Sequence, residues 1–254
     1  MFLIYNIAMH TLWQTIFYQP IYNILIFITN NVTFGDLGFA IIIITIIIKF
    51  ILYPLTKKSI KSQILMKKME PEIKLIKKNF PNKEEQAKKT FELYKKYGTN
   101  PFSGCLVVLL QLPVLFALYF VVYKGLSIDN NLVYSFLQKP ISINTNFLGL
   151  IEMGGKSVFL AVLAGATQFI QGHLSSPIKP KQEILKEGET PEATSFQDEL
   201  ASSMQTNVKY ILPIFITIIS WQISAAVALY FVISNIFTIV QEWYIRRTLE
   251  DKII

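Results

Sequence analysis

One uninterrupted apolar run constrains this chain more than any other feature. Residues 37–56 read LGFAIIIITIIIKFILYPLT, and Lys49 is the single charged side chain among them. About 20 apolar residues suffice for a helix to cross a hydrocarbon layer roughly 30 Å thick. The many isoleucines would suit a strand in water, but in lipid each backbone hydrogen bond must be made within the segment, which favours a helix. The run therefore predicts a membrane-spanning helix.

The composition of the whole chain agrees with a membrane protein. Of the 254 residues, 52% are apolar and 16% are charged, and the mean hydropathy is +0.42. A typical soluble domain carries roughly 25% charged residues, so a soluble α/β enzyme, a disordered chain and a nucleic-acid-binding module are disfavoured. One cysteine excludes a disulfide framework, and two histidines leave little material for a metal site. We expect no metal and no other cofactor.

The sequence contains none of the patterns that usually mark an enzyme. Ser-His-Asp, Cys-His, paired-carboxylate and phosphate-loop arrangements are all missing from it. We therefore expect no catalytic residues and no enzymatic activity.

The positive charge is concentrated in one segment. Residues 57–98 hold 13 lysines and five glutamates, which gives a larger net charge than the +7 of the whole chain. A basic segment between long apolar runs is typical of a cytoplasmic loop under the positive-inside rule. Base-reading or stacking features do not accompany the lysines, so we expect no nucleic-acid specificity. This pattern places the N-terminus outside and the C-terminus in the cytoplasm of a multi-pass protein.

These signals together predict an all-α polytopic membrane protein with five transmembrane helices. The predicted spans cover residues 34–56, 101–124, 148–173, 208–223 and 224–247. The predicted connections are an N-terminal interfacial amphipathic helix (1–33), a basic cytoplasmic helical hairpin (57–100), an outer loop (125–147), an acidic cytoplasmic loop (174–207) and a short cytoplasmic tail (248–254). A full span is the alternative for the N-terminal helix.

Lys49 is the strongest candidate for a functional residue. It precedes Lys57 by eight residues, which puts it roughly 12 Å inside the cytoplasmic end of its helix. A charge at the centre of a span costs about 2.5–3.5 kcal/mol on insertion scales. Two interpretations stay open, because the side chain either reaches the inner headgroups or faces a wet cavity between helices.

Polar side chains at similar depth occur in all five predicted spans. Singly, each is more often an interhelical hydrogen bond than a site, but together they could line one hydrophilic groove beside the lysine. The candidate groove-lining residues are Thr45, Gln111, Gln168, Ser220, Ser234 and Asn235. In the hairpin, the residues expected to contact lipid or a partner molecule are Lys67, Lys68, Lys77, Lys78, Lys88 and Lys89.

Four blocks of the chain resemble the YidC/Oxa/Alb family of membrane protein insertases. They are TLWQTIFYQPIYNIL (11–25), IIIITIIIKFILYPLTKKSIKSQ (41–63), YKKYGTNPFSGCLVVLLQLPVLFALY (94–119) and ALYFVISNIFTIVQEWYIRR (228–247). The resemblance implies a five-helix core with a cytoplasmic hairpin. It also implies a hydrophilic groove that opens to cytosol and lipid but is closed on the outer side.

The chain departs from the family pattern at positions that matter for the groove. Lys49 stands where the family usually has an arginine, which keeps the charge and loses the bidentate fork. Tyr230 is followed by Phe231 where a tyrosine pair is often found, so Tyr230 is the one hydroxyl of that pair expected to line the groove. The family's Pro-Ser/Ala-Gly before the last span is replaced by residues 221–230, which read WQISAAVALY.

The resemblance implies an insertase and chaperone of the bacterial plasma (inner) membrane. Its expected partners are nascent membrane proteins and the lipid bilayer, with the Sec translocon and the ribosome as candidates. Two other hypotheses remain at this stage, a small ion-coupled transporter and an assembly factor that binds helices without inserting them. The lack of an internal repeat counts against the transporter.

Overall fold

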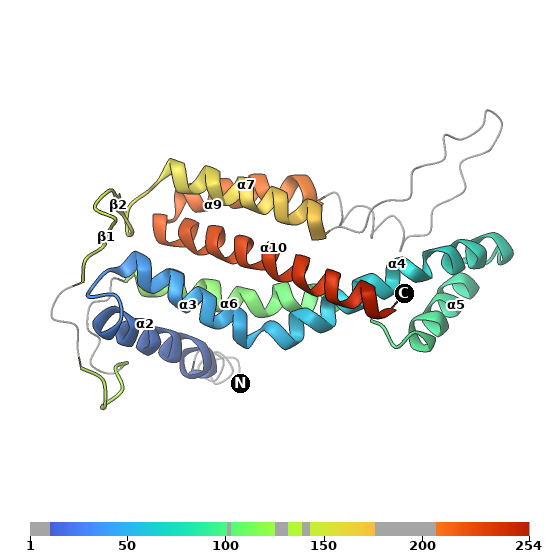
Figure 1. The fold of residues 1–254 in the computed structure, drawn as a ribbon, viewed down its shortest axis with the longest axis horizontal. Helices are drawn as coiled ribbons and strands as arrows, with labels where there is room; N and C mark the ends of the chain where they lie inside the picture. The colour runs from blue at the N-terminus through green and yellow to red at the C-terminus, as the bar shows by residue number, and fades with distance from the viewer. Residues whose placement is uncertain (1–10, 101–102, 125–131, 139–142, 176–206, 254) are drawn as a thin grey trace, which may run out of the picture.

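The computed structural model describes residues 11–100, 103–124, 132–138, 143–175 and 207–253, and these are helical almost throughout (Figure 1). The first part of the chain contains a short π-helical segment η1 (Gln14–Tyr18) and the helices α2 (Gln19–Asn31), α3 (Leu37–Ile51), α4 (Tyr53–Asn79), α5 (Lys83–Lys96) and α6 (Ser103–Tyr123). The second part contains β1 (Asn146–Phe147), β2 (Ile151–Glu152), α7 (Val158–Ser175), the π-helical η2 (Asn207–Ile211), α9 (Leu212–Gln222) and α10 (Ala225–Ile253). The predicted all-α class is confirmed.

The helices α3, α6 and α9 lie within three of the five predicted spans, whereas α7 and α10 overlap the other two and extend beyond their predicted ends at residues 173 and 247. Two of the described helical stretches, α7 and the part of α10 from Ala225 to Leu249, are each long and apolar enough to cross a membrane. The pair α3 and α4 counts as a third if it forms one span, although its axes are bent by 59°. The bend lies at Leu52, just before Pro54 in the first turn of α4, where proline suits the start of a helix. The number of five spans stays a prediction.

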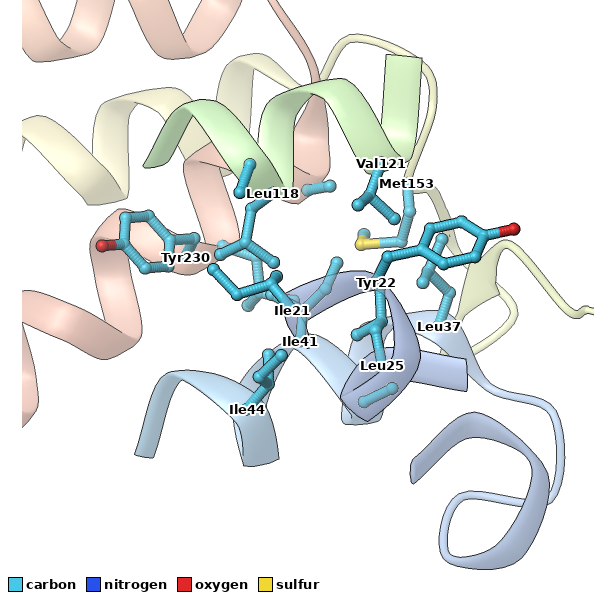
Figure 2. Packing of buried hydrophobic residues seen from close by; sticks show 14 of the residues in the cluster. Ile21, Tyr22, Leu25, Leu37, Ile41, Ile44, Leu118, Val121, Met153 and Tyr230 are labelled. Atoms are coloured by element: carbon cyan, nitrogen blue, oxygen red, sulfur yellow. The ribbon is translucent and has the colours of Figure 1, made fainter. Parts of the chain in front are cut away.

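A continuous apolar core joins the N-terminal helix to α3, α6 and α10. Tyr22 and Leu25 of α2, Ile41 of α3, Leu118 of α6 and Tyr230 of α10 are all buried in it (Figure 2). The opposite face of the N-terminal helical stretch is also apolar, with exposed Leu12, Ile16, Ile24 and Phe27. A helix that is apolar on both faces suits contact with the bundle on one side and with lipid on the other. Its interfacial position remains a prediction.

The outward faces of the bundle helices are apolar as well. Exposed side chains include Leu106, Leu109, Leu112 and Phe116 of α6, Val158, Phe159, Val162 and Ile170 of α7, and Ile214, Phe215, Ile218 and Trp221 of α9. Soluble proteins rarely expose contiguous apolar patches larger than a few hundred Å². Lipid is the solvent that such faces require, so the fold is that of an integral membrane protein.

The basic hairpin is formed by α4 and α5 and projects from one end of the bundle (Figure 1). Asn82 caps α5, because its side chain accepts a hydrogen bond of 2.9 Å from the backbone N–H of Glu84. The Tyr97 hydroxyl donates to the Glu72 carboxylate, and Lys96 Nζ lies 3.5 Å from the same group. At the base, Ser62 Oγ donates to the backbone carbonyl of Asn100 at 2.9 Å. The two arms are therefore tied together at two levels.

Close packing of α7 against η2 and α9 depends on glycine. A Cβ atom at Gly165 would lie 1.8 Å from Thr217 Oγ1, and one at Gly172 would lie 2.9 Å from the backbone oxygen of Val208. Thr217 cannot turn aside freely, because its hydroxyl donates to the Pro213 carbonyl at 2.8 Å. Small residues at such contacts let helix backbones approach closely in membranes.

We expect Gly165→Ala to destabilise the bundle by roughly 1–3 kcal/mol, which is the usual cost of overpacking. The measurement is thermal unfolding of the purified protein in detergent. Gly154→Ala is the control, because the nearest atom to its added Cβ, Glu152 Oε1, is 3.6 Å away. Equal melting temperatures for the two variants would contradict this account of the helix contact.

We also expect the hairpin to loosen in acid. The hydrogen bond from Tyr97, helped by Lys96, lowers the pKa of the Glu72 carboxyl below its ordinary value of 4.5. An opened hairpin would therefore bind the proton more readily, so this stabilisation is present above about pH 4.5 and is lost as the pH falls through the folded pKa. Hydrogen exchange of α5 amides, corrected for intrinsic rates, measures the effect. In Tyr97→Phe the α5 amides should be less protected from exchange at neutral pH, and they should lose less protection on acidification. If the variant loses as much protection as the wild type, this hydrogen bond does not have the proposed role.

Candidate functional site

Lys49 lies on the side of α3 that packs against α10. Its Nζ donates a hydrogen bond of 3.0 Å to Thr238 Oγ1, and the Thr238 hydroxyl donates at 2.8 Å to the backbone carbonyl of Ser234. Next to this contact the rings of Phe50 and Phe237 meet edge to face, with centroids 5.2 Å apart. The ammonium group is thus held by a neighbouring helix beside an aromatic contact, and its role in a groove stays a prediction.

Two predicted groove-lining residues accompany this contact, one turn earlier on each helix. Thr45 precedes Lys49 by four residues and therefore lies on the same face of α3. It is buried, and its hydroxyl donates to the Ile41 carbonyl at 2.6 Å. Ser234, also buried, has the same relation to Thr238 on α10. The structure therefore places two hydroxyl groups between α3 and α10 near the lysine.

Asn235 points to a different neighbour. Its Nδ2 donates to Thr167 Oγ1 at 3.2 Å and to the Ala164 carbonyl at 3.4 Å, both on α7. The residue is buried and ties α10 to α7. Asn235 and Ser234 are adjacent in the sequence and so face different directions from the helix axis, which is why only one of them lies on the side of α3.

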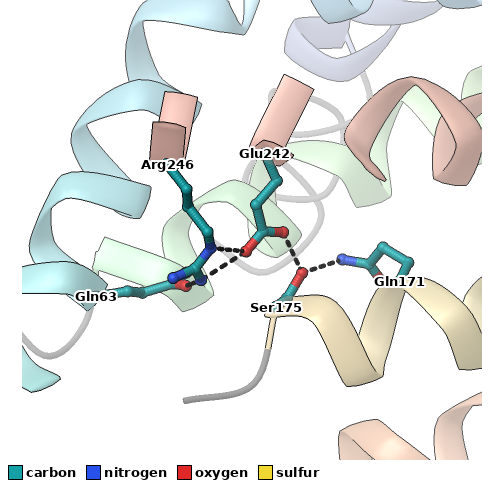
Figure 3. A network of polar contacts seen from close by, with 5 residues as sticks. All are labelled: Gln63, Gln171, Ser175, Glu242 and Arg246. Atoms are coloured by element: carbon teal, nitrogen blue, oxygen red, sulfur yellow. Dashed lines mark hydrogen bonds and ion pairs between the residues drawn. The ribbon is translucent and has the colours of Figure 1, made fainter. Parts of the chain in front are cut away.

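A polar network of Gln63, Gln171, Ser175, Glu242 and Arg246 lies at the end of the bundle next to the hairpin (Figure 3). Gln168 joins this network through Gln171. Its Nε2 donates to Gln171 Oε1 at 2.9 Å, Gln171 donates to Ser175 Oγ at 3.0 Å, and Ser175 donates to the carboxylate of Glu242. The same carboxylate accepts two hydrogen bonds from Arg246, at 2.6 and 2.9 Å.

The network continues from α10 into the hairpin. Arg246 Nη2 donates to Gln63 Oε1 on α4 at 3.1 Å. Beside it, Ile60 and Ile64 of α4 pack with Ile245 of α10 in a second apolar cluster. These contacts fix α4 against the ends of α7 and α10. The sequence predicts only Gln168 of this site, although Glu242 and Arg246 have the four-residue spacing of a helical ion pair.

Three other predicted residues have buried polar atoms without a hydrogen-bond partner among the described residues. They are Nε2 of Gln111, Oγ of Ser220 and the hydroxyl of Tyr230, on α6, α9 and α10 respectively. Ser220 and Tyr230 are almost completely buried. Buried polar groups normally have a partner, so these three atoms can form hydrogen bonds with a polar group that enters the bundle. No hydrogen bond in the described part of the chain links them to Lys49.

The six predicted hairpin lysines lie on α4 and α5. Lys67, Lys68, Lys78 and Lys88 are exposed, whereas Lys77 and Lys89 are half-buried. Lys89 also pairs with Glu92 at 3.0 Å. The hairpin therefore presents a basic surface, and only part of its charge is neutralised by glutamates on the same helices.

Comparison with known proteins identifies relatives over most of the chain. A membrane protein insertase YidC from Fusobacterium nucleatum is 31% identical over 221 residues, which is 86% of this chain and 90% of that protein. A membrane protein insertase YidC 1 from Halalkalibacterium halodurans is 25% identical and matches 94% of this chain and 81% of its own length. The insertase YidC of Wolinella succinogenes is also 31% identical, but only 35% of its length is matched.

A solved structure shares the fold. It is described as an active YidC insertase crystal structure with the first transmembrane domain resolved, and it matches with a TM-score of 0.54 at 20% identity. The match covers 91% of this chain and 46% of that chain.

The family model described as 60Kd inner membrane protein matches residues 27–252. This range includes Lys49 and three of the four sequence blocks completely. The resemblance to the YidC/Oxa/Alb insertases is thereby confirmed, and the chain belongs to the 60Kd inner membrane protein family.

Proposed function

We propose that this protein is a membrane protein insertase and chaperone. It moves hydrophilic tails of nascent membrane proteins through a positively charged groove and releases their helices into the bilayer. The observation that carries the proposal is the ammonium group of Lys49, held at 3.0 Å by Thr238 between two apolar helices. Intramembrane charges are rare and usually functional.

Lys49 attracts acidic groups in the polar tail of a client. At 4 Å two unit charges interact by about 4 kcal/mol at an effective dielectric constant near 20, against about 1 kcal/mol in water. The Thr238 hydroxyl is a neutral acceptor, so a client carboxylate competes well for the ammonium group. Thr45, Ser234 and the unpartnered atoms of Gln111, Ser220 and Tyr230 offer hydrogen bonds that replace water around the tail.

Release into lipid supplies the driving force. A client helix that leaves the groove buries apolar surface worth about 25 cal/mol per Å². A helix of about 20 apolar residues thereby offsets the transfer of a short polar tail. The reaction then consists of binding and partitioning, without a nucleotide or another cofactor.

The hairpin receives the client on the cytoplasmic side. Its lysines attract acidic client segments and anionic lipid headgroups, and the ribosome and the Sec translocon are further candidate partners of the same surface. This assignment places the protein in the bacterial plasma membrane, with the N-terminus outside and the C-terminus in the cytoplasm, as the positive-inside rule requires.

The charge of Lys49 should decide how well acidic tails are inserted. In liposomes containing the purified protein, we expect Lys49→Gln to reduce protease protection of a single-span client with an acidic N-terminal tail by about tenfold, the equivalent of one charge-assisted hydrogen bond. Lys49→Arg should retain insertion, because it keeps the charge. Thr238→Val should retain insertion as well, since it removes only the acceptor with which the client competes.

A client with a neutral tail is the internal control, and it should be much less sensitive to Lys49→Gln. Equal insertion of the acidic client by wild type and Lys49→Gln would remove Lys49 from the mechanism. If the folded wild type inserts neither client, autonomous insertase activity is wrong, and stable client complexes without insertion would instead identify an assembly factor.

The Glu242 network should hold the hairpin at the entrance of the groove. Replacing Glu242 by Gln removes the charge that pairs with half-buried Arg246 and should lower the stability by about 1–3 kcal/mol. Glu92→Gln is the matched control, because the Lys89–Glu92 pair lies at the surface and such pairs contribute about 0–1 kcal/mol. Thermal unfolding in detergent compares the two variants. Similar effects of both substitutions would mean that the network does not fasten the hairpin.

A further inference from the structure

Two turns at one end of the bundle have an unusual sequence for their backbone conformation. In the turn between α2 and α3, Phe34 has φ +50° and Gly35 has φ +93°. In the turn between β1 and β2, Leu148 has φ +53° and Gly149 has φ +70°. Phe34 and Leu148 are the only residues other than glycine with positive φ in the part of the chain that the structure describes.

Neither backbone geometry nor core packing explains these two side chains. Two successive residues with positive φ favour Asn-Gly, Asp-Gly or Gly-Gly, because larger side chains are strained there. Phe34 and Leu148 are also 95% and 62% exposed, so they contribute little to the core. The local backbone and the core therefore leave the choice of large apolar residues at these two positions unexplained.

Two more large apolar side chains are exposed at the same end. Leu150 is 84% exposed in the turn that contains Leu148, and Phe136 is 77% exposed in the segment 132–138. Hydrogen bonds hold these segments together, since the Asn144 N–H donates to the Gly35 carbonyl and the Asn30 side chain donates to the Gln138 carbonyl, both at 2.8 Å. The lysine-rich hairpin lies at the opposite end of the molecule (Figure 1).

We propose that Phe34, Phe136, Leu148 and Leu150 anchor this end of the bundle in the headgroup and upper acyl region of the membrane leaflet opposite the hairpin. The four side chains continue the apolar outer surface of the bundle, where Phe39 at the start of α3 and Phe159 at the start of α7 are also exposed.

A lipid surface fits this arrangement better than a protein partner does. Polar residues separate the apolar tips, because Ser135, Asn144, Asn146 and Glu152 are exposed between them, whereas the core of a protein interface is a continuous apolar patch. The described charged residues at this end are Asp36, Lys124, Glu152 and Lys156. Two acids and two bases give no net attraction to anionic lipid, so an uncharged phospholipid surface suffices.

Single-cysteine labelling tests the proposal in liposomes. In a Cys105→Ser background, Phe34→Cys, Phe136→Cys, Leu148→Cys and Leu150→Cys each receive an environment-sensitive fluorophore, with Ser135→Cys and Asn146→Cys as exposed polar controls. We expect blue-shifted emission and quenching by brominated lipid at the four apolar positions, and quenching by aqueous iodide at the two controls. Iodide quenching at all six positions would overturn the proposal.

Lipid composition and a second variant separate the remaining outcomes. Quenching by brominated lipid should be equal in phosphatidylcholine vesicles and in vesicles with added phosphatidylglycerol; a requirement for the anionic lipid would contradict an apolar anchor. The double variant Phe34→Gly, Leu148→Gly should melt in detergent at the same or a higher temperature than wild type, because glycine suits positive φ. A lower melting temperature would show that these side chains serve the fold. Neither readout depends on insertion of a client.

Discussion

The structure depends on one constraint, which is that polar groups inside a lipid-embedded bundle must find their partners within the protein. Helices satisfy the backbone, but side-chain donors need acceptors on neighbouring helices. Lys49 donates a hydrogen bond to Thr238, Asn235 donates to Thr167, and Arg246 donates to Glu242 and Gln63. Except for the Arg246–Glu242 pair, which lies within α10, each contact joins two helices that are distant in the sequence, so satisfaction of polar groups also decides how the bundle is assembled.

These contacts differ in how completely their hydrogen-bond donors and acceptors are paired. Around Glu242 the donors and acceptors match, and the apolar cluster of Ile60, Ile64 and Ile245 packs beside them. At that end of the bundle, these contacts therefore hold the hairpin firmly against the helices. Around Lys49 a full charge meets a neutral hydroxyl, and five other buried polar atoms of the described residues have no hydrogen-bond partner there. The polar groups around Glu242 are hydrogen-bonded to one another, which keeps the bundle in shape. The polar groups further inside are incompletely hydrogen-bonded, so they can form new hydrogen bonds with a polar tail.

The candidate site was predictable in part. The depth of Lys49 follows from counting residues, and Thr45 and Ser234 do lie near it on the facing helices. The sequence does not predict a role for Thr238 or Thr167, because a single hydroxyl in an apolar span does not by itself indicate a site. Thr238 is distinguished only by its four-residue spacing from Ser234. Gln168 and Asn235 were placed in one set with Lys49 by depth alone, whereas the structure gives them contacts with Gln171 and with α7.

The amino-acid sequence was enough to predict the helical class, the apolar segments, the basic hairpin and the place of Lys49 as the one charge in its apolar segment. These features are set by local composition, capping and the length needed to cross a bilayer. Which helix faces are in contact could be seen only in the folded structure. A helix such as α3 is apolar all round, so its periodicity does not reveal which side turns to α10 and which to lipid. The hydrogen bonds of Lys49 and Glu242 depend on how each helix is rotated about its axis. This rotation is set by the packing of all the helices together.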